Sequence, residues 1–147
     1  MGTQQLLLIV LGVVIVGIAI AVGITMFKGS AETSNRDQVV SDLENLGSKA
    51  QQYYRKPLSF GGGENNFEGF NLMPLDTGNG DGSFSVTTSA PSLSDLSNIA
   101  GSTVPVSSST QTIYLIGCGK ETGNDGVNPV KAYLIVTADT LQVTILN

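Results

Sequence analysis

The strongest constraint in this sequence lies at its beginning, where the first 27 residues carry no charged side chain. Leu6 to Phe27 form one apolar segment of 22 residues, interrupted only by Thr25 and three glycines, Gly12, Gly17 and Gly23. As an α-helix this segment extends about 33 Å, which is enough to cross the hydrocarbon core of a bilayer. A helix that is apolar on all sides must be buried in lipid or among other apolar helices.

The flanks of the apolar segment differ from those of a cleaved secretory signal. Such a signal has a basic flank, a shorter apolar region and a cleavage site of small residues. The five residues before Leu6 include no Lys or Arg, and no small-residue site follows Phe27. We therefore expect the segment to be retained in the working protein.

Charge and composition narrow the classes of function. Lys28 to Lys56 contain five basic and four acidic residues, whereas Pro57 to Asn147 contain two basic and eight acidic residues. The acidic second part is a poor candidate for binding nucleic acid, which requires a basic surface. The chain has no histidine, and its one cysteine, Cys118, excludes an intramolecular disulfide. We therefore expect the chain not to be an enzyme, and we expect it to have no catalytic residues and no cofactor site.

A second periodic pattern follows the apolar segment. Apolar and small residues recur at helical spacing, and this stripe consists of Val39, Val40, Leu43, Leu46, Gly47, Ala50, Tyr53 and Tyr54. Pro57 disfavours helical backbone at the preceding residue, so the helix should end near Arg55. Residues 3 to 55 are thus predicted to form one long helix. The residues around Gly29 have low helix propensity, which leaves open a bend there or a straight passage.

The remainder of the chain is predicted to be β-rich. Alternating patterns favour strands at residues 83–87, 112–118, 131–137 and 141–146. Turn-forming residues at 76–82, 123–126 and 139–140 separate them, Gly61–Gly63 are expected to be a flexible connector, and residues 88–111 are expected to be loops. The predicted fold class is α+β, with a small antiparallel sheet packed on the amphipathic half of the helix. Its segments are 1–27 (apolar helix), 28–56 (amphipathic helix) and 57–147 (globular domain).

This layout resembles that of type IV pilins, which have an apolar N-terminal helix continuing into an amphipathic half that carries an antiparallel sheet. The resemblance covers the whole architecture, and in sequence it is specific only to residues 1–27. It departs from the family in more than one respect: pilins usually have glutamate at the fifth mature residue, and many close a C-terminal loop with a disulfide, which the single cysteine of this chain cannot form. If Met1 is the mature start, the fifth residue is Gln5, and cleavage after Gly2 would instead make it Leu7. Archaeal flagellins and adhesion pilins share the apolar-helix plan.

The resemblance implies a structural subunit that is held in the inner membrane before assembly. Dedicated pilus assembly machinery would then build it into an extracellular filament on the cell surface. Its partners would be identical copies, without nucleic acid. Gln4 and Gln5 are expected to hydrogen-bond to neighbouring chains, since each is an amide next to an apolar bundle. The expected filament-core interface consists of Gln4, Gln5, Leu6, Leu7, Leu8, Ile9, Val10, Leu11, Val13, Val14, Ile15, Val16, Ile18, Ile20, Val22, Ile24 and Phe27. Whether such a filament serves adhesion, motility or DNA uptake stays open.

A different class of function remains open beside the filament. The alternative is that the apolar helix is the single-pass anchor of a monomeric binding module that displays its acidic β-domain; the amphipathic continuation of the helix favours the filament. The helix glycines permit close packing of helices, but they are also common in ordinary membrane helices.

Three smaller features each have two interpretations. Asn79 and Asp81 match part of an EF-hand calcium loop, although a plain turn explains the same residues. Tyr53 and Tyr54 are more typical of packing under a sheet than of an electron-conducting aromatic chain. Cys118 is more typical of a buried, inert thiol than of a reactive one.

Overall fold

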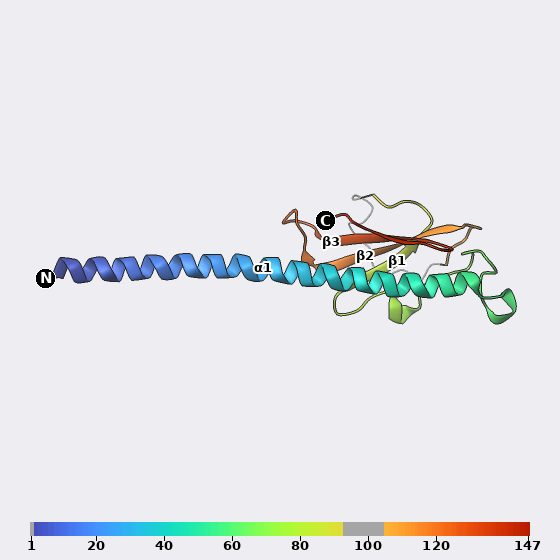
Figure 1. The fold of residues 1–147 in the computed structure, drawn as a ribbon, viewed down its shortest axis with the longest axis horizontal. Coiled ribbons are helices and arrows are strands. Elements are labelled where there is room, and N and C mark those ends of the chain that lie inside the picture. The colour runs from blue at the N-terminus through green and yellow to red at the C-terminus, as the bar shows by residue number, and fades with distance from the viewer. Residues whose placement is uncertain (1, 93–104) are drawn as a thin grey trace.

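A long helix carrying a compact β-rich head makes up this protein (Figure 1). The computed structural model describes residues 2–92 and 105–147. The elements are the helix α1 (Gly2–Arg55), the short 3₁₀ helices η1 (Leu58–Phe60) and η2 (Pro74–Asp76), and four strands, β1 (Gly82–Thr87), β2 (Thr112–Thr122), β3 (Pro129–Thr137) and β4 (Leu141–Ile145). The predicted α+β fold class is therefore confirmed.

Helix α1 is continuous over 54 residues, or about 80 Å, and passes through the low-propensity stretch around Gly29 without a break. Two local interactions lie in that stretch. The Thr33 hydroxyl donates to the Gly29 carbonyl at 2.9 Å, and Arg36 forms an ion pair with Glu32 one turn before it. The helix ends at Arg55, where the sequence predicts its end.

The four strands form one antiparallel sheet in the order β1-β2-β3-β4, which is the predicted meander. Strand β2 continues four residues beyond its predicted end and β3 begins two residues earlier than predicted. The β2–β3 register shifts between Cys118 and Thr122, which marks an irregularity near the end of β2. Residues 88–92 and 105–111 contain no strand, as expected, and the rest of that predicted loop lies outside the described residues.

The core lies between α1 and one face of the sheet. Alternate residues of the two central strands, Ile113 and Leu115 on β2 and Leu134 and Val136 on β3, are fully buried. The predicted helix stripe is confirmed: most of its residues are buried, and Val40 and Tyr53 are partly buried against the core. Helix and sheet approach closely at Gly47, because a Cβ there would lie 2.4 Å from a Leu134 methyl group.

The chain between α1 and β1 covers the helix on the side away from the sheet, so the helix is enclosed from two directions (Figure 1). Lys49 on α1 pairs with Asp76 of η2 at 2.7 Å, which fixes this segment to the helix. Tyr53 lies edge-on to Phe70, with ring centroids 5.4 Å apart, and its hydroxyl donates to the Glu68 carbonyl at 2.8 Å. This geometry agrees with the packing interpretation of the tyrosine pair.

Candidate assembly surface: the apolar helix, the neck and the distal hook

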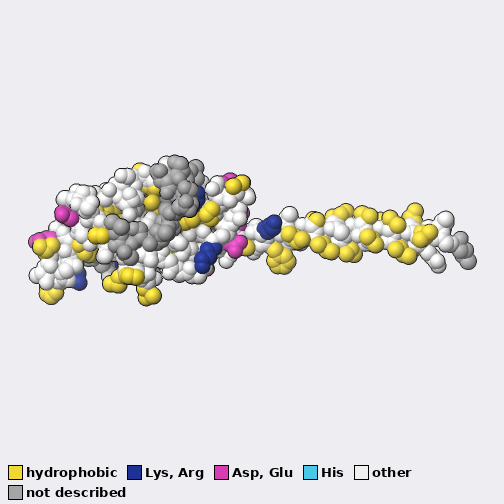
Figure 2. All heavy atoms as spheres, turned by 180° about the vertical axis from the view of Figure 1, so that it is seen from behind, with side chains coloured by type: hydrophobic (Ala, Val, Ile, Leu, Met, Phe, Trp, Pro, Cys, Tyr) yellow, Lys and Arg dark blue, Asp and Glu magenta, His cyan; other side chains and the backbone are white. Residues whose placement is uncertain are grey.

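The N-terminal half of α1 projects from the head with nothing covering it (Figure 2). Every large apolar side chain from Leu6 to Phe27 is more than half exposed, with values from 51% at Leu11 to 78% at Phe27. Gln4 and Gln5 lie exposed in the first turn. The predicted interface residues therefore form one continuous surface around the helix, and none of them is used by the core of the head.

Such a surface cannot stay in water. Covering one large aliphatic side chain stabilises by about 1.5–3 kcal/mol relative to water. The apolar half of α1 is also long and apolar enough to cross a membrane. A Cβ added at Gly12, Gly17 or Gly23 would meet nothing within 4 Å, so the fold of the single chain does not require glycine at these positions.

The neck, defined as residues 25–36 of α1 with the β2–β3 loop, is the point where the helix leaves the head (Figure 1). Asn35 fastens the two parts together and is only 8% exposed. Its amide nitrogen donates to the Asp81 carbonyl at 2.8 Å. Its side-chain oxygen accepts from the backbone N–H groups of Lys120 and Glu121 at 3.2 and 3.3 Å. Gly119 permits this approach, because a Cβ there would lie 2.1 Å from the Asn35 oxygen.

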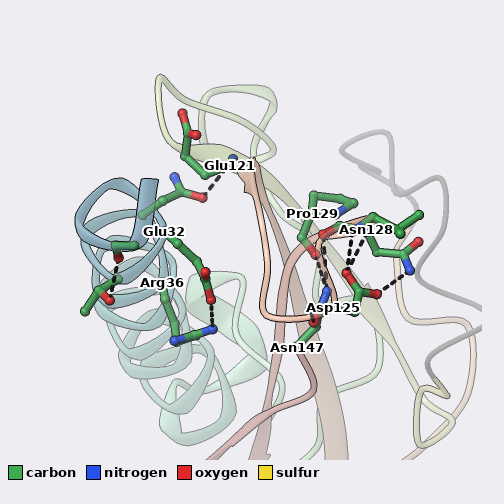
Figure 3. A network of polar contacts seen from close by, with 11 residues as sticks. Glu32, Arg36, Glu121, Asp125, Asn128, Pro129 and Asn147 are labelled. Atoms are coloured by element: carbon green, nitrogen blue, oxygen red, sulfur yellow. Dashed lines mark hydrogen bonds and ion pairs between the residues drawn. The ribbon is translucent and has the colours of Figure 1, made fainter. Parts of the chain in front are cut away.

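The β2–β3 loop at the neck is held by its own polar side chains. The Asp125 carboxylate accepts from the backbone N–H groups of Val127 and Asn128 at 2.9 and 2.8 Å, and from the Asn128 side chain at 2.5 Å. These hydrogen bonds, led by that of the Asn128 side chain, hold the pKa of Asp125 far below its ordinary value. Asn147 donates to the carbonyls of Asn128 and Pro129, both at 3.2 Å, which ties the last residue to the loop (Figure 3).

A groove of about 650 Å³ lies at the neck, between helix residues 25–32 and loop residues 121–126. Phe27 and Ala31 give it apolar walls, and Gly123 and Gly126 leave its loop side without bulk. Three charged residues, Lys28, Glu32 and Glu121, also line it. Glu32 is already paired with Arg36, and the Glu121 carboxylate points away from that pair (Figure 3).

The opposite end of the head carries a hook, defined as residues 57–65. The Gly63 amide donates to the Tyr53 carbonyl at 2.9 Å, and the Asn65 amide to the Tyr54 carbonyl at 2.8 Å. The hook therefore satisfies carbonyl groups that the end of α1 leaves unpaired. Gly62 and Gly63 are buried, so the prediction that Gly61–Gly63 form a flexible connector is wrong.

The hook exposes two apolar side chains at its tip: Leu58 is 67% exposed and Phe60 is 73% exposed. Gly61 follows them in the left-handed conformation, with φ 74°, and its amide donates to the Leu58 carbonyl at 2.9 Å. The tip is thus a closed turn in which glycine is favoured, and its apolar side chains have no place in the core.

Asn79 and Asp81 belong to a turn in which the Asn79 side chain and the Asp81 backbone groups are hydrogen-bonded. The Asn79 side-chain oxygen accepts from the backbone N–H groups of Asp81 and Gly82, both at 2.9 Å, and its nitrogen donates to the Asp42 carboxylate at 2.6 Å. Among the residues that the structure describes, no group of three or more metal-binding side chains occurs. The plain-turn interpretation accounts for this geometry.

Cys118 lies directly opposite Lys131 of β3 in the sheet. Burial raises the pKa of its thiol, and the positive charge of Lys131 opposes this only in part. Because the thiolate is the reactive form, the raised pKa agrees with an inert thiol, although Cys118 is half-buried rather than buried. Lys131 is 2% exposed, a burial that no sequence pattern indicated.

The sequence places the apolar surface correctly but does not reveal the neck or the hook. Asn35 belongs to a polar stretch whose composition indicates only weak helix, although its position four residues before Val39 puts it on the same helical face as the buried stripe. Comparison of the chain with protein-family models, curated proteins and solved structures finds no match. The architecture is pilin-like in having a long apolar helix packed on a small antiparallel sheet.

Proposed function

We propose that this chain is the structural subunit of an extracellular, pilus-like filament, in which the apolar halves of many α1 helices form a common core. The observation that carries the proposal is the continuity of α1. Its first half is exposed on all sides, and its second half is the rigid support of the head. An anchored binding module more often follows a flexible linker, whereas a regular polymer needs each head held at one orientation to its core helix.

Assembly by this mechanism begins in the inner membrane. There the apolar half of α1 is surrounded by lipid, and in the filament it exchanges lipid for neighbouring helices. Each added copy presents the same surface again, so growth is open-ended. Gln4 and Gln5 lie at the end of this surface and form hydrogen bonds with neighbouring chains there. The helix side chains that form the contact are those named above from Leu6 to Phe27.

Shearing of cells tests the proposal. Thin, uniform filaments in the sheared fraction, containing this chain by mass spectrometry, are the expected result in electron microscopy. Exposure to detergent should dissolve them, because detergent offers the core helices the same apolar surroundings. Recovery of the chain only from membranes, with no filament under several growth conditions, would instead favour the single-pass anchored module.

A control variant separates assembly from expression. Gln142 is exposed on β4, remote from the apolar half of α1, and Gln142→Lys should leave filament yield unchanged. Replacing both Gln4 and Gln5 by Leu keeps the helix able to enter a membrane but removes the amides. That pair of substitutions should lower filament yield while the amount of chain in the membrane stays constant.

A further inference from the structure

The two ends of the head carry features that match one another. At the distal end the hook exposes Leu58 and Phe60, which the fold of the chain itself does not use. At the neck lies a groove of about 650 Å³ whose helix wall includes Phe27, itself 78% exposed. One end therefore has apolar side chains without a pocket, and the other has a partly apolar pocket without an occupant.

Both ends carry both signs of charge, since the hook itself contains Glu64 and Lys28 also lines the groove. Lys56 directly precedes the hook, and Glu121 lies on the rim of the groove. Within residues 2–92 and 105–147, neither the Lys56 ammonium nor the Glu121 carboxylate takes part in an ion pair. An end-to-end contact between two copies would bring these opposite charges together beside the apolar side chains.

The proportions of α1 fit the same contact. Its apolar half, residues 2–27, extends about 39 Å, and the half that supports the head, residues 28–55, extends about 42 Å. If the heads of two copies meet end to end, the apolar half of one copy runs alongside the head of the other and ends near its neck. The core of apolar helix halves and the outer layer of heads then repeat at the same interval along the filament, without gaps in either.

We propose that the Leu58–Phe60 hook of one copy docks in the neck groove of the next copy along the filament axis. The contact joins two different surfaces of the same chain, and such head-to-tail interfaces generate open helical polymers rather than closed dimers. Phe60 and Leu58 fill the groove against Phe27, while Lys56 approaches Glu121. The inference rests on the proposed filament function and adds a second, water-facing contact to the apolar core.

Cysteine pairing in filaments tests the contact directly. In a Cys118→Ser background, Phe60→Cys combined with Thr122→Cys should give, on mild oxidation of sheared filaments, a ladder of disulfide-linked multimers. Thr122 lines the groove and is exposed. Leu75→Cys with Thr122→Cys is the matched control: Leu75 is an 89% exposed apolar residue outside the hook, and this pair should give no ladder.

A charge exchange gives a second, independent readout. Lys56→Glu and Glu121→Lys, each alone, place like charges at the contact and should lower filament yield severalfold, because the contact recurs at every subunit. The two substitutions together restore opposite charges and should restore the yield. Filaments that form normally in all three variants and show no Phe60–Thr122 ladder would overturn the hook contact while leaving the filament function intact. Absence of filaments from the unaltered chain would instead contradict the proposed function itself.

Discussion

The two halves of α1 form one continuous helix but differ in how much of their apolar surface the rest of the chain covers. The second half has one apolar stripe, and the head covers it, so Val39 and Leu43 are fully buried within a single chain. The first half is apolar all round, and every large side chain in it stays exposed. The width of the apolar surface thus decides whether a helix completes a domain or requires other molecules. The same kind of substitution should therefore have opposite consequences in the two halves.

The largest effect is expected from a charge in the first half. Ile15→Asp would bury an unpaired carboxylate among apolar helices, at a cost of several kcal/mol, and should abolish filaments. Ser41→Asp, on the exposed side of the second half, is the matched control and should leave filament yield unchanged. Electron microscopy of sheared fractions is the measurement. Filaments formed by the Ile15→Asp chain would show that this helix is not the core.

Replacing a leucine by alanine should have the larger effect in the second half, where it should lower the stability of the head. Leu43→Ala leaves a cavity under the sheet and should lower the free energy of unfolding of the head by about 2–5 kcal/mol. Leu8→Ala removes the same atoms from a side chain that is 66% exposed, and it should leave the free energy of unfolding of the head unchanged. Chemical unfolding of the full chain in detergent, followed by tyrosine fluorescence, compares them. Equal effects would mean that the two halves are not energetically distinct.

Substitution of Asn35, which joins α1 to the head at the neck, should lower the stability of the head. Asn35→Ala leaves the Lys120 amide and the Asp81 carbonyl without their partner and should lower the free energy of unfolding by about 1–3 kcal/mol. Gly119→Ala should destabilise by collision with the Asn35 side chain. The double variant should lose less than the sum of the two, since the first substitution removes the colliding atom. Strict additivity in the same unfolding assay would contradict this arrangement.

The smallest effect is expected at Asp125, which is exposed in the β2–β3 loop. Its carboxyl pKa is lowered in the folded chain, so the hydrogen bonds it accepts are present above the ordinary pKa of about 3.9 and are lost as the pH falls through the folded value. The amide proton resonances of Val127 and Asn128 in the detergent-solubilised chain should therefore titrate with a midpoint below about 3.9. A midpoint at or above this value would show that the loop is open in solution.

The parts of the fold that sequence alone predicted are those governed by repetition. The apolar segment, the 4-and-3 spacing from Val39 to Tyr53 and the alternation in β2, β3 and β4 each average over many residues. Pro57 placed the helix end correctly because its ring restricts the residue before it. Each of these patterns can be recognised without knowing which distant residues pack against it.

The parts that sequence did not predict depend on single contacts between distant residues. Asn35 meets Asp81 and Glu121 only after the sheet has formed, and a single Asn has no periodic signature. The glycines of the hook are the same residue type that forms flexible linkers. Their fixed positions come from hydrogen bonds to the end of α1 and from close packing against Lys56. The predicted filament interface lies on the exposed helix, and its partners can be found only in an assembly.

The unbroken helix also has a mechanical consequence. In the proposed filament, a pull on the head would be carried to the core along a single continuous helix. The stretch from Lys28 to Ser34 is the weak part of that helix, because it is largely exposed and its sequence has low helix propensity. Under tension we expect this stretch to unwind first, and its seven residues would lengthen from about 10 Å to about 23 Å as they change from helical to extended backbone. A filament of the proposed kind would then be stiff at low force and extensible above a threshold, with an elastic element inside every neck.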